Sequence, residues 1–261
     1  MKVEIIVAAH KEYQMPQEAC YLPVQVGKYG KEPIGYQGDD EGDNISEKNA
    51  LYCELTGMYW MWKNTQADYY GLVHYRRYFT VVPPLKRWKK DPFSLILTER
   101  QIKRLVKKYD LILPKKRNYI IETIASHYGH THYPEHLEET RNIIRETCPD
   151  YEAAFEWVMR QRQGHMFNMF IMKKELFDQY CEWLFPILRQ LEHRIDCSKY
   201  NAFQARYIGR ISELLLNVWV HQNQIPYHEI PVISIEKVQW KKKIVSFVKA
   251  KYFDKKYENS F

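Results

Sequence analysis

The chain has 261 residues, of which 45% are hydrophobic and 15% aromatic, and a formal net charge of +7. This length and apolar content are enough for one large α/β domain with a buried core. Eight lysines lie between positions 237 and 256, so much of the positive charge belongs to the C-terminal tail; together with the lack of RNP, KH or helix-turn-helix patterns, this argues against a nucleic-acid-binding protein.

The five cysteines have no CxxC or CxxH spacing, which predicts reduced thiols of a cytosolic protein and no structural zinc site. The first residues turn polar too soon for a signal peptide, and no stretch approaches the length of a membrane span. We therefore expect a cytoplasmic protein.

The first expected strand covers residues 2–9 and is rich in β-branched residues, as in a strand buried on both faces. It ends in Ala8 and Ala9, followed by His10. Small side chains at the end of a first strand let a nucleotide base lie close to the backbone. The same residues could also be a plain edge of the core.

A polar, glycine-rich segment at 21–43 follows, and we expect a short strand at 23–26 within it. Its end carries the carboxylates Asp39, Asp40 and Asp43. Oxygen ligands in a loop could hold a divalent cation, or they could form a solvated turn.

Residues 44–64 are expected to form one helix, because apolar residues recur there at helical spacing. Lys48 and Asn49 lie in its first turns, where backbone N–H groups and the helix dipole favour an anion.

The segment from Asp68 to Thr80, DYYGLVHYRRYFT, combines an apolar strand with an abrupt change to polar residues. Ligands of open α/β sheets bind beyond the carboxyl ends of the strands. The polar residues there are His74, Tyr75, Arg76 and Arg77. Their cations predict an anionic ligand such as a diphosphate; alternatively, the arginines pair with surface carboxylates while the tyrosines pack.

A helix at 97–109 capped by Thr98 and a strand at 111–113 come next. The segment 119–133 then brings Glu122 together with His127, His130 and His132. Imidazoles at this spacing could share a metal ion, but no HExxH pattern completes the set, and we favour contacts with a sugar. Helices are expected at 136–146 and 151–160.

Residues 164–172, GHMFNMFIM, are expected to form a strand that contains Asn168. A buried Asn must be hydrogen-bonded, and a ligand rich in hydroxyl groups is one possible partner. Helices follow at 174–194 and 207–222. In the second of these Glu213 lies among apolar residues, so it is either salt-bridged, to Arg206 or Arg210, or a catalytic base.

After a last strand at 230–235, residues 238–256 place aromatic and lysine positions on opposite faces of a helix. This pattern is typical of an interfacial helix on anionic lipid, and a helix docked on the core with a solvated lysine face is the alternative. We therefore expect a domain at 1–236 and a basic amphipathic tail at 237–261.

Several of these blocks together resemble a bacterial family catalogued as a domain of unknown function (DUF4422), which accompanies capsule, exopolysaccharide and O-antigen enzymes. They are DNISEKNALYCELTGMYWMWKN, DYYGLVHYRRYF, LILPKKRNYIIET, NMFIMKKELFDQYCEWLFPIL and GRISELLLNVW. The resemblance covers the chain to about residue 236 and implies a glycosyltransferase with a GT-A-like α/β fold, in which one nucleotide-binding sheet is flanked by helices.

By this resemblance the substrate is a UDP-sugar, with a hexose, guessed as galactose, moved to a lipid-linked oligosaccharide. Ala8, Ala9 and His10 would meet the nucleoside. The residues HYRR would stand where GT-A enzymes carry a metal-binding DxD, so no cofactor is expected, with Mn²⁺ or Mg²⁺ at Asp39, Asp40 and Asp43 in reserve. Asn168 would face a hexose.

An inverting reaction needs a carboxylate that accepts the proton of the acceptor hydroxyl. The resemblance of GRISELL makes Glu213 the first choice, although the family pattern SERL has Arg where this chain has Leu214, and Glu122 is the second choice. The tail would hold the protein at the inner face of the cell membrane. The alternative function is a nucleotide-sugar or carbohydrate-binding module without turnover, which the missing DxD would suit.

Overall fold

The computed structural model describes residues 1–88 and 90–236, and the chain divides into two compact units. In the described part, unit 1 consists of Met1–Lys115, Phe167–Cys181 and Pro226–Glu236, and unit 2 of Lys116–Met166 and Glu182–Ile225. The expected α/β class, a mostly parallel sheet flanked by helices, is confirmed. The expected C-terminal helix lies outside the described residues.

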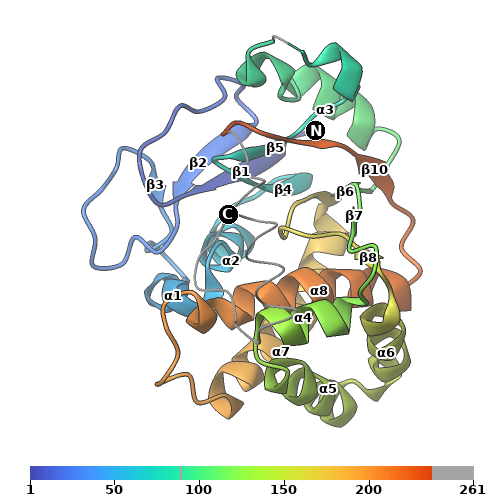
Figure 1. Cartoon of the computed structure of the whole chain (residues 1–261). Helices are drawn as coiled ribbons and strands as arrows, with labels where there is room; N and C mark the ends of the chain where they lie inside the picture. Colours follow the sequence, from blue (N-terminus) through green and yellow to red (C-terminus); the bar gives the residue numbers. More distant parts are fainter. Residues whose placement is uncertain (89, 237–261) are drawn as a thin grey trace. The chain divides into compact units, whose positions relative to one another are not determined.

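The sheet belongs to unit 1 (Figure 1). Its main path runs β10 (His228–Ile230), β6 (Leu111–Pro114), β9 (Phe170–Lys173), β4 (Tyr69–His74), β1 (Val3–Ala9), β2 (Tyr21–Gln25) and β3 (Gln37–Gly38). Along this path β9 is antiparallel to both neighbours, and the other adjacent pairs are parallel. The carboxyl ends of β1 and β4 therefore lie at one edge of the sheet, as the sequence predicts.

Two short strands extend this edge. β5 (Arg77–Phe79) pairs antiparallel with the end of β4, His74 opposite Arg77, and also with β11 (Val232–Ser234). The polar residues HYRR thus form a tight turn between β4 and β5. The C-terminal part of unit 1 is bound to this turn through β11.

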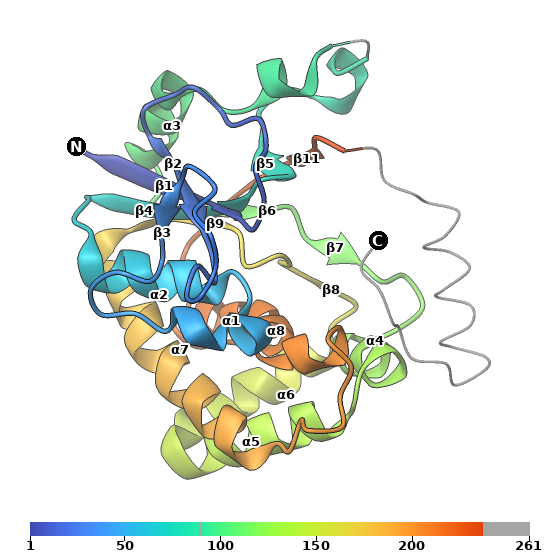
Figure 2. The same ribbon diagram turned by 90° about the vertical axis from the view of Figure 1, so that its left-hand side faces the viewer.

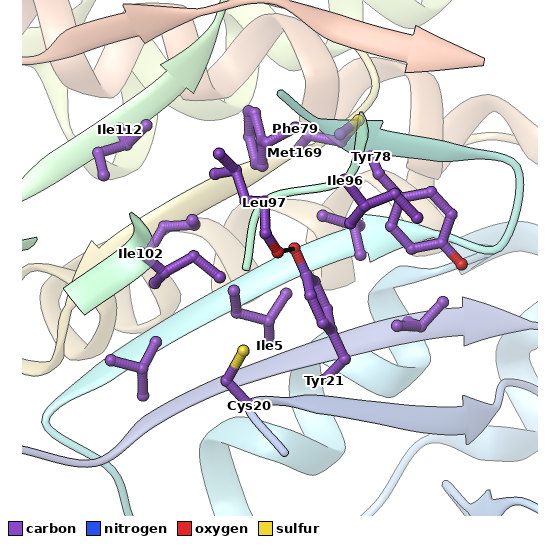
Figure 3. Packing of buried hydrophobic residues seen from close by; sticks show 14 of the residues in the cluster. Ile5, Cys20, Tyr21, Tyr78, Phe79, Ile96, Leu97, Ile102, Ile112 and Met169 are labelled. Carbon is purple, nitrogen blue, oxygen red and sulfur yellow. Dashed lines mark hydrogen bonds between the residues drawn. The ribbon is translucent and has the colours of Figure 1, made fainter. Parts of the chain in front are cut away.

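Helices cover both faces of the sheet in unit 1 (Figure 2), with α2 (Leu55–Asn64) on one side and α3 (Glu99–Val106) on the other. Gly57 lets α2 approach β1 closely, because a Cβ there would lie 3.3 Å from Ile6 Cδ1. Successive residues of a strand point to opposite faces. Ile5 accordingly belongs to the cluster that packs under α3 (Figure 3). In that cluster the Tyr21 hydroxyl donates to the Leu97 carbonyl at 3.0 Å.

The helix expected at 44–64 is broken into three pieces: η1 (Ser46–Lys48), α1 (Asn49–Tyr52) and α2. The break is at Cys53, whose φ of 55° lies in the left-handed region and cannot continue a right-handed helix. Asn49 stabilises the break, since its side-chain amide donates to the Cys53 carbonyl at 2.7 Å. Helical spacing alone did not predict this interruption.

A local sequence signal correctly predicted the start of α3. Thr98 caps α3 in a capping box with Gln101, as expected. Short 3₁₀ turns, η2 (Pro84–Lys86) and η3 (Pro92–Leu95), precede it. The strand expected at 164–172 begins only at Phe170, because Phe167 and Asn168 have φ values of 77° and 53°.

Unit 2 is mainly helical (Figure 1). Its elements are β7 (Arg117–Asn118), α4 (Ile124–Thr131), α5 (Glu135–Thr147), η4 (Pro149–Tyr151), α6 (Glu152–Arg160), β8 (Gln163–Gly164), η5 (Gln204–Arg206) and α8 (Tyr207–Gln222). The 21-residue helix α7 (Lys174–Arg194) contributes its first part to unit 1 and its second part to unit 2. No helix in the described ranges is long and apolar enough to cross a membrane.

Candidate functional site

The carboxyl ends of β1 and β4 are joined directly in unit 1. Ala8 pairs with His74 in the parallel register, and the backbone N–H of Tyr75 donates to the Ala8 carbonyl at 3.2 Å. The Ala9 carbonyl accepts from Val26 N–H at 2.9 Å. Ala8 and Ala9 are both buried. Their carbonyl groups join the end of β1 to the residues that follow β4 and β2. The small residues predicted to border a nucleotide base therefore connect three backbone segments at this edge.

Tyr75 is the centre of a group of aromatic and cationic side chains. Its buried ring meets the rings of His10 and Tyr13 edge-on, with centroid distances of 5.2 and 5.1 Å. Lys11 Nζ and the Arg76 guanidinium carbon lie 5.5 and 5.1 Å from its centroid, within cation–π range. The ring therefore holds two cations beside the ends of β1 and β4.

Arg76 also pairs with a carboxylate. Its Nη1 lies 3.1 Å from Glu236 Oε2, and the two side chains are 38% and 40% exposed. Burial, together with the Glu236 carboxylate and a hydrogen bond to it, raises the pKa of the neighbouring Tyr13. These contacts match the alternative in which the arginine pairs and the tyrosines pack. The predicted diphosphate would have to compete with Glu236, a residue that the sequence did not single out.

His74 and Arg77 both contact Phe167. His74 Nε2 lies 2.6 Å from the Phe167 carbonyl oxygen, and the Arg77 guanidinium carbon lies 4.7 Å from the centroid of the Phe167 ring. Because a carbonyl only accepts, Nε2 must carry the proton of this hydrogen bond. His74 thus fixes the turn that leads into β9.

Burial lowers the pKa of His74, and Arg77 and Arg76 lower it further against the opposing effects of Glu54 and the Phe167 carbonyl. A neutral imidazole with its proton on Nε2 still donates to Phe167. His74 therefore holds the turn without adding positive charge at neutral pH, and the cationic character of the edge comes from the arginines and Lys11.

Asn168 follows in the same turn. Its side-chain amide donates to Glu54 Oε1 at 2.8 Å, and Glu54 is the N-cap residue immediately before α2. Two consecutive non-glycine residues with positive φ cost of order 1–3 kcal/mol each and persist only where the surroundings hold them. Here His74 and Glu54 hold them, and no periodicity of the sequence points to Glu54.

The three reserve metal ligands have separate roles. The buried Asp39 accepts hydrogen bonds from Gly27 N–H at 2.8 Å, Lys28 N–H at 3.0 Å and the Ser46 hydroxyl. Asp40 lies 3.5 Å from Lys28 Nζ, and Asp43 accepts from the Tyr59 hydroxyl at 3.1 Å. Among the described residues, no group of three or more His, Cys, Asp or Glu side chains could hold a metal ion.

Lys48 and Asn49 lie at the junction of η1 and α1 rather than in the first turns of one long helix. The Asn49 side chain fills the space next to Gly27, where a Cβ would clash with Asn49 Cγ. Its amide is engaged by the Cys53 carbonyl and by Thr56 Oγ1 at 3.1 Å. Asn49 thus has a clear structural role in this segment.

The two carboxylates predicted as catalytic bases both belong to unit 2. Glu122 is buried, with Oε2 lying 3.1 Å from His127 Nδ1 and Oε1 lying 2.9 Å from His130 Nδ1. Burial alone would raise the pKa of Glu122, but the hydrogen bonds from the two imidazoles outweigh it and lower the pKa. Glu122 is therefore ionised and bridges two histidines of α4.

Glu213 is half-buried on α8, one turn from Arg210. The Arg210 guanidinium donates to the Phe203 carbonyl at 2.5 Å and stacks on the Phe203 ring at 4.1 Å. His132 is the third histidine of HYGHTH, and its Nδ1 lies 3.0 Å from Gln204 Oε1 in the core of unit 2. The histidine cluster thus splits into a pair around Glu122 and a separate core residue.

Comparisons with known proteins are consistent with this fold. Residues 4–224 match the family described as "Domain of unknown function (DUF4422)". A search of the curated proteins gave no match. A solved chain, the apo structure of the bifunctional glycosyltransferase WbbM, superposes with a TM-score of 0.81 at 32% identity, over 91% of this chain and 46% of that chain. The chain thus spans about half the length of that protein.

Proposed function

The chain belongs to the family described as a domain of unknown function (DUF4422), and we propose that it is a glycosyltransferase that uses a nucleotide sugar. In this proposal the donor is a UDP-hexose, namely UDP-galactose, and the acceptor is a lipid-linked oligosaccharide of capsule, exopolysaccharide or O-antigen synthesis. The similarity to WbbM, a bifunctional glycosyltransferase, supports the reaction class.

The observation that carries this proposal is the set of cations at the carboxyl ends of β1 and β4. Arg76 and Arg77 follow β4, and Lys11 follows β1. Departure of a nucleoside diphosphate builds negative charge on the leaving oxygen, and guanidinium groups held in place stabilise such charge. In this proposal the arginines bind the diphosphate, Ala8, Ala9 and His10 border the nucleoside, and Asn168 borders the hexose.

The proposal does not use a metal ion. Both carboxylate oxygens of Asp39 already accept hydrogen bonds from the backbone, and Asp40 and Asp43 have other partners. These residues do not fit the shared ligand set of one divalent cation. Arg76 and Arg77 supply the positive charge in its place.

Because the proposed acceptor is lipid-linked, we also assign a function to the tail at residues 237–261. Eight lysines between 237 and 256 would be attracted to anionic lipid, at about 1 kcal/mol per lysine near the surface. We propose that the tail holds the protein at the cytoplasmic face of the membrane. Removal of residues 237–261 should release the protein from anionic vesicles and leave UDP binding intact; continued sedimentation with the vesicles would contradict this role.

The test of the donor site is calorimetric titration with UDP, alone, with EDTA and with added Mn²⁺. Binding should survive EDTA and weaken at least tenfold in Arg76→Ala. Arg145→Ala is a matched control, because Arg145 is an exposed arginine of unit 2 that also pairs with one glutamate, Glu152, at 2.6 Å. Binding that requires Mn²⁺ would contradict the proposed metal-free site.

The competing function is a module that binds nucleotide sugars or carbohydrates without turnover. It would be favoured if UDP-galactose bound but was neither transferred nor hydrolysed with any acceptor. A nucleic-acid-binding protein would instead keep polynucleotide affinity in Arg76→Ala and show no UDP binding.

A further inference from the structure

We propose that the loop at residues 81–90, between β5 and η3, is a membrane-contact loop that inserts exposed apolar side chains between the headgroups of anionic phospholipids. The loop lies wholly within unit 1, and Figure 2 shows the segment between β5 and α3 extending away from the sheet. It acts together with the tail, whose eight lysines supply most of the attraction, so that removal of the tail still releases the protein. The surface takes no part in the proposed sugar transfer, and the two can be tested separately.

The membrane-contact loop carries the two most exposed large hydrophobic side chains of the described residues. Leu85 is 95% exposed and Trp88 is 81% exposed, and Val81 before them is 42% exposed. Single apolar residues on a surface are common, whereas several together mark a surface for a partner or a membrane. Trp is enriched where a membrane meets water, because its ring is apolar and its N–H can still be hydrogen-bonded. These side chains therefore suit the headgroup region of a bilayer.

The loop is held in its conformation by its own backbone and by one arginine. Two prolines, Pro83 and Pro84, restrict the backbone. Their carbonyl groups accept from the N–H groups of Lys86 and Arg87 at 2.9 and 3.1 Å. The Arg87 side chain closes the loop, since its Nε donates to the Val82 carbonyl at 2.8 Å. The turn is thus preorganised, which reduces the entropy that binding would otherwise cost.

Positive charge surrounds the two apolar side chains. Residues 86–90 read KRWKK, with four cations and no carboxylate. Lys86 and Lys90 are exposed, and neither forms an ion pair within the part of the chain that the structure describes. The next acid along the chain is Asp91, which follows the loop as the N-cap residue of η3. A lysine near an anionic leaflet strengthens binding about fivefold, so the charge of the loop favours anionic lipid.

A bilayer fits this surface better than a protein or a nucleic acid does. Lysine is depleted at the centre of protein interfaces, whereas here lysines flank the tryptophan on both sides. At a bilayer surface a lysine extends its amine to the phosphates, while a neighbouring apolar side chain enters below them. A nucleic acid would stack a base on Trp88 and would leave Leu85 in water.

The first experiment measures co-sedimentation of the full chain with vesicles of phosphatidylglycerol and phosphatidylethanolamine. The double variant Leu85→Ser/Trp88→Ser should lower the partition coefficient about tenfold or more, because the two apolar side chains are no longer available to leave water. Tyr29→Ser is the matched control, since Tyr29 is a 62% exposed aromatic residue of unit 1 outside the loop. The tail is present in every variant, so its contribution cancels. A partition coefficient equal to that of the wild type in the double variant would overturn the inference.

The charge of the loop is tested with Lys86→Ala/Lys90→Ala. This variant should bind the same vesicles up to about 25-fold more weakly at low salt, at about fivefold per lysine, and should bind phosphatidylcholine vesicles as the wild type does. Lys31→Ala, which removes an exposed lysine of unit 1 outside the loop, should keep the wild-type partition coefficient. No loss with the anionic vesicles, or an equal loss with phosphatidylcholine, would contradict the proposal.

Trp88 also reports insertion directly. The difference in emission between the wild type and Trp88→Phe isolates this one of the seven tryptophans. With the anionic vesicles this emission should shift to shorter wavelength, and lipids brominated on their acyl chains should quench it. Unchanged emission would overturn the inference, and so would loop-dependent binding of a poly(dT) oligonucleotide by a protein that does not bind the vesicles. Absence of UDP binding in the wild type would overturn the proposed function and leave these vesicle measurements unaffected.

Discussion

Glu236 lies 3.1 Å from Arg76 although 160 positions separate the two residues in the sequence. The backbone supports this contact, because Ile235 N–H donates to the Arg76 carbonyl at 2.9 Å and β11 pairs with β5. The ion pair is therefore a consequence of how the last strand of unit 1 is bound to the turn after β4. It places a carboxylate where the proposed diphosphate would bind.

Replacing Glu236 by Gln should strengthen UDP binding, because the diphosphate no longer competes with a carboxylate for Arg76. Exposed ion pairs contribute about 0–1 kcal/mol, so we expect Kd to fall by up to about fivefold. Calorimetry measures this directly. Glu152→Gln, which removes the partner of Arg145 in unit 2, should leave Kd unchanged, and weaker UDP binding in Glu236→Gln would assign Glu236 a direct role in the ligand site.

Replacing His74 by Phe should destabilise the protein. Phenylalanine keeps a flat aromatic ring at this position, but the Phe167 carbonyl loses the donor that lies 2.6 Å away, and an unsatisfied buried acceptor costs about 1–3 kcal/mol. Urea unfolding gives the change in free energy. His74→Gln, which retains an N–H donor, should recover part of the loss; an unchanged urea midpoint in His74→Phe would show that the turn does not depend on this bond.

Stability should fall when the pH is lowered, in part through His132. Burial, with Arg210 nearby, lowers the pKa of His132 to about 2 against a hydrogen bond with Gln204. The unfolded chain, with a histidine pKa near 6.5, binds more protons than the folded chain below that pH. Each such histidine therefore contributes a slope of up to about 1.4 kcal/mol per pH unit.

Urea unfolding from pH 7 to pH 4.5 tests this contribution. His132→Gln should reduce the slope by up to one proton, and the exposed His193→Gln should not change it. Equal slopes in the wild type and both variants would mean that His132 takes up a proton in the folded protein.

Much of unit 1 could be predicted from local sequence. β1 and β4 are continuous apolar runs, and Thr98 with Gln101 is a capping pattern, so each is specified by residues a few positions apart. The placement of HYRR at the carboxyl end of a strand follows from the same reasoning. These elements were identified because their determinants are local.

The turn at Phe167 and Asn168 could not be predicted in this way. Its positive φ values depend on His74, 93 positions away, and on Glu54, 114 positions away. The segment GHMFNMFIM is apolar enough for a strand along its whole length. Tertiary hydrogen bonds override that propensity, and they also link His74 and Asn168, which the sequence had singled out separately.

Replacing Asp39 by Asn should destabilise the protein and leave its response to Mn²⁺ unchanged. The carboxylate accepts from Gly27 N–H, Lys28 N–H and the Ser46 hydroxyl. Gly27 has a φ of 65°, a conformation that favours glycine. The hydrogen bond from Gly27 N–H to the Asp39 carboxylate stabilises this turn. An Asn would place an NH₂ group against one of these donors.

The expected loss is about 2–4 kcal/mol in urea unfolding, since each hydrogen bond to a charged group contributes about 1.5–3 kcal/mol. Asp40→Asn is the matched control, because Asp40 has one partly exposed partner at 3.5 Å and should lose less than about 1 kcal/mol. If Asp39→Asn instead kept its stability and lost a Mn²⁺-dependent gain in UDP affinity, this loop would be a metal site after all. If Asp39→Asn lost stability and Mn²⁺ did not restore it, Asp39 would be a structural carboxylate. The arginines after β4 would then supply the positive charge that stabilises a departing diphosphate.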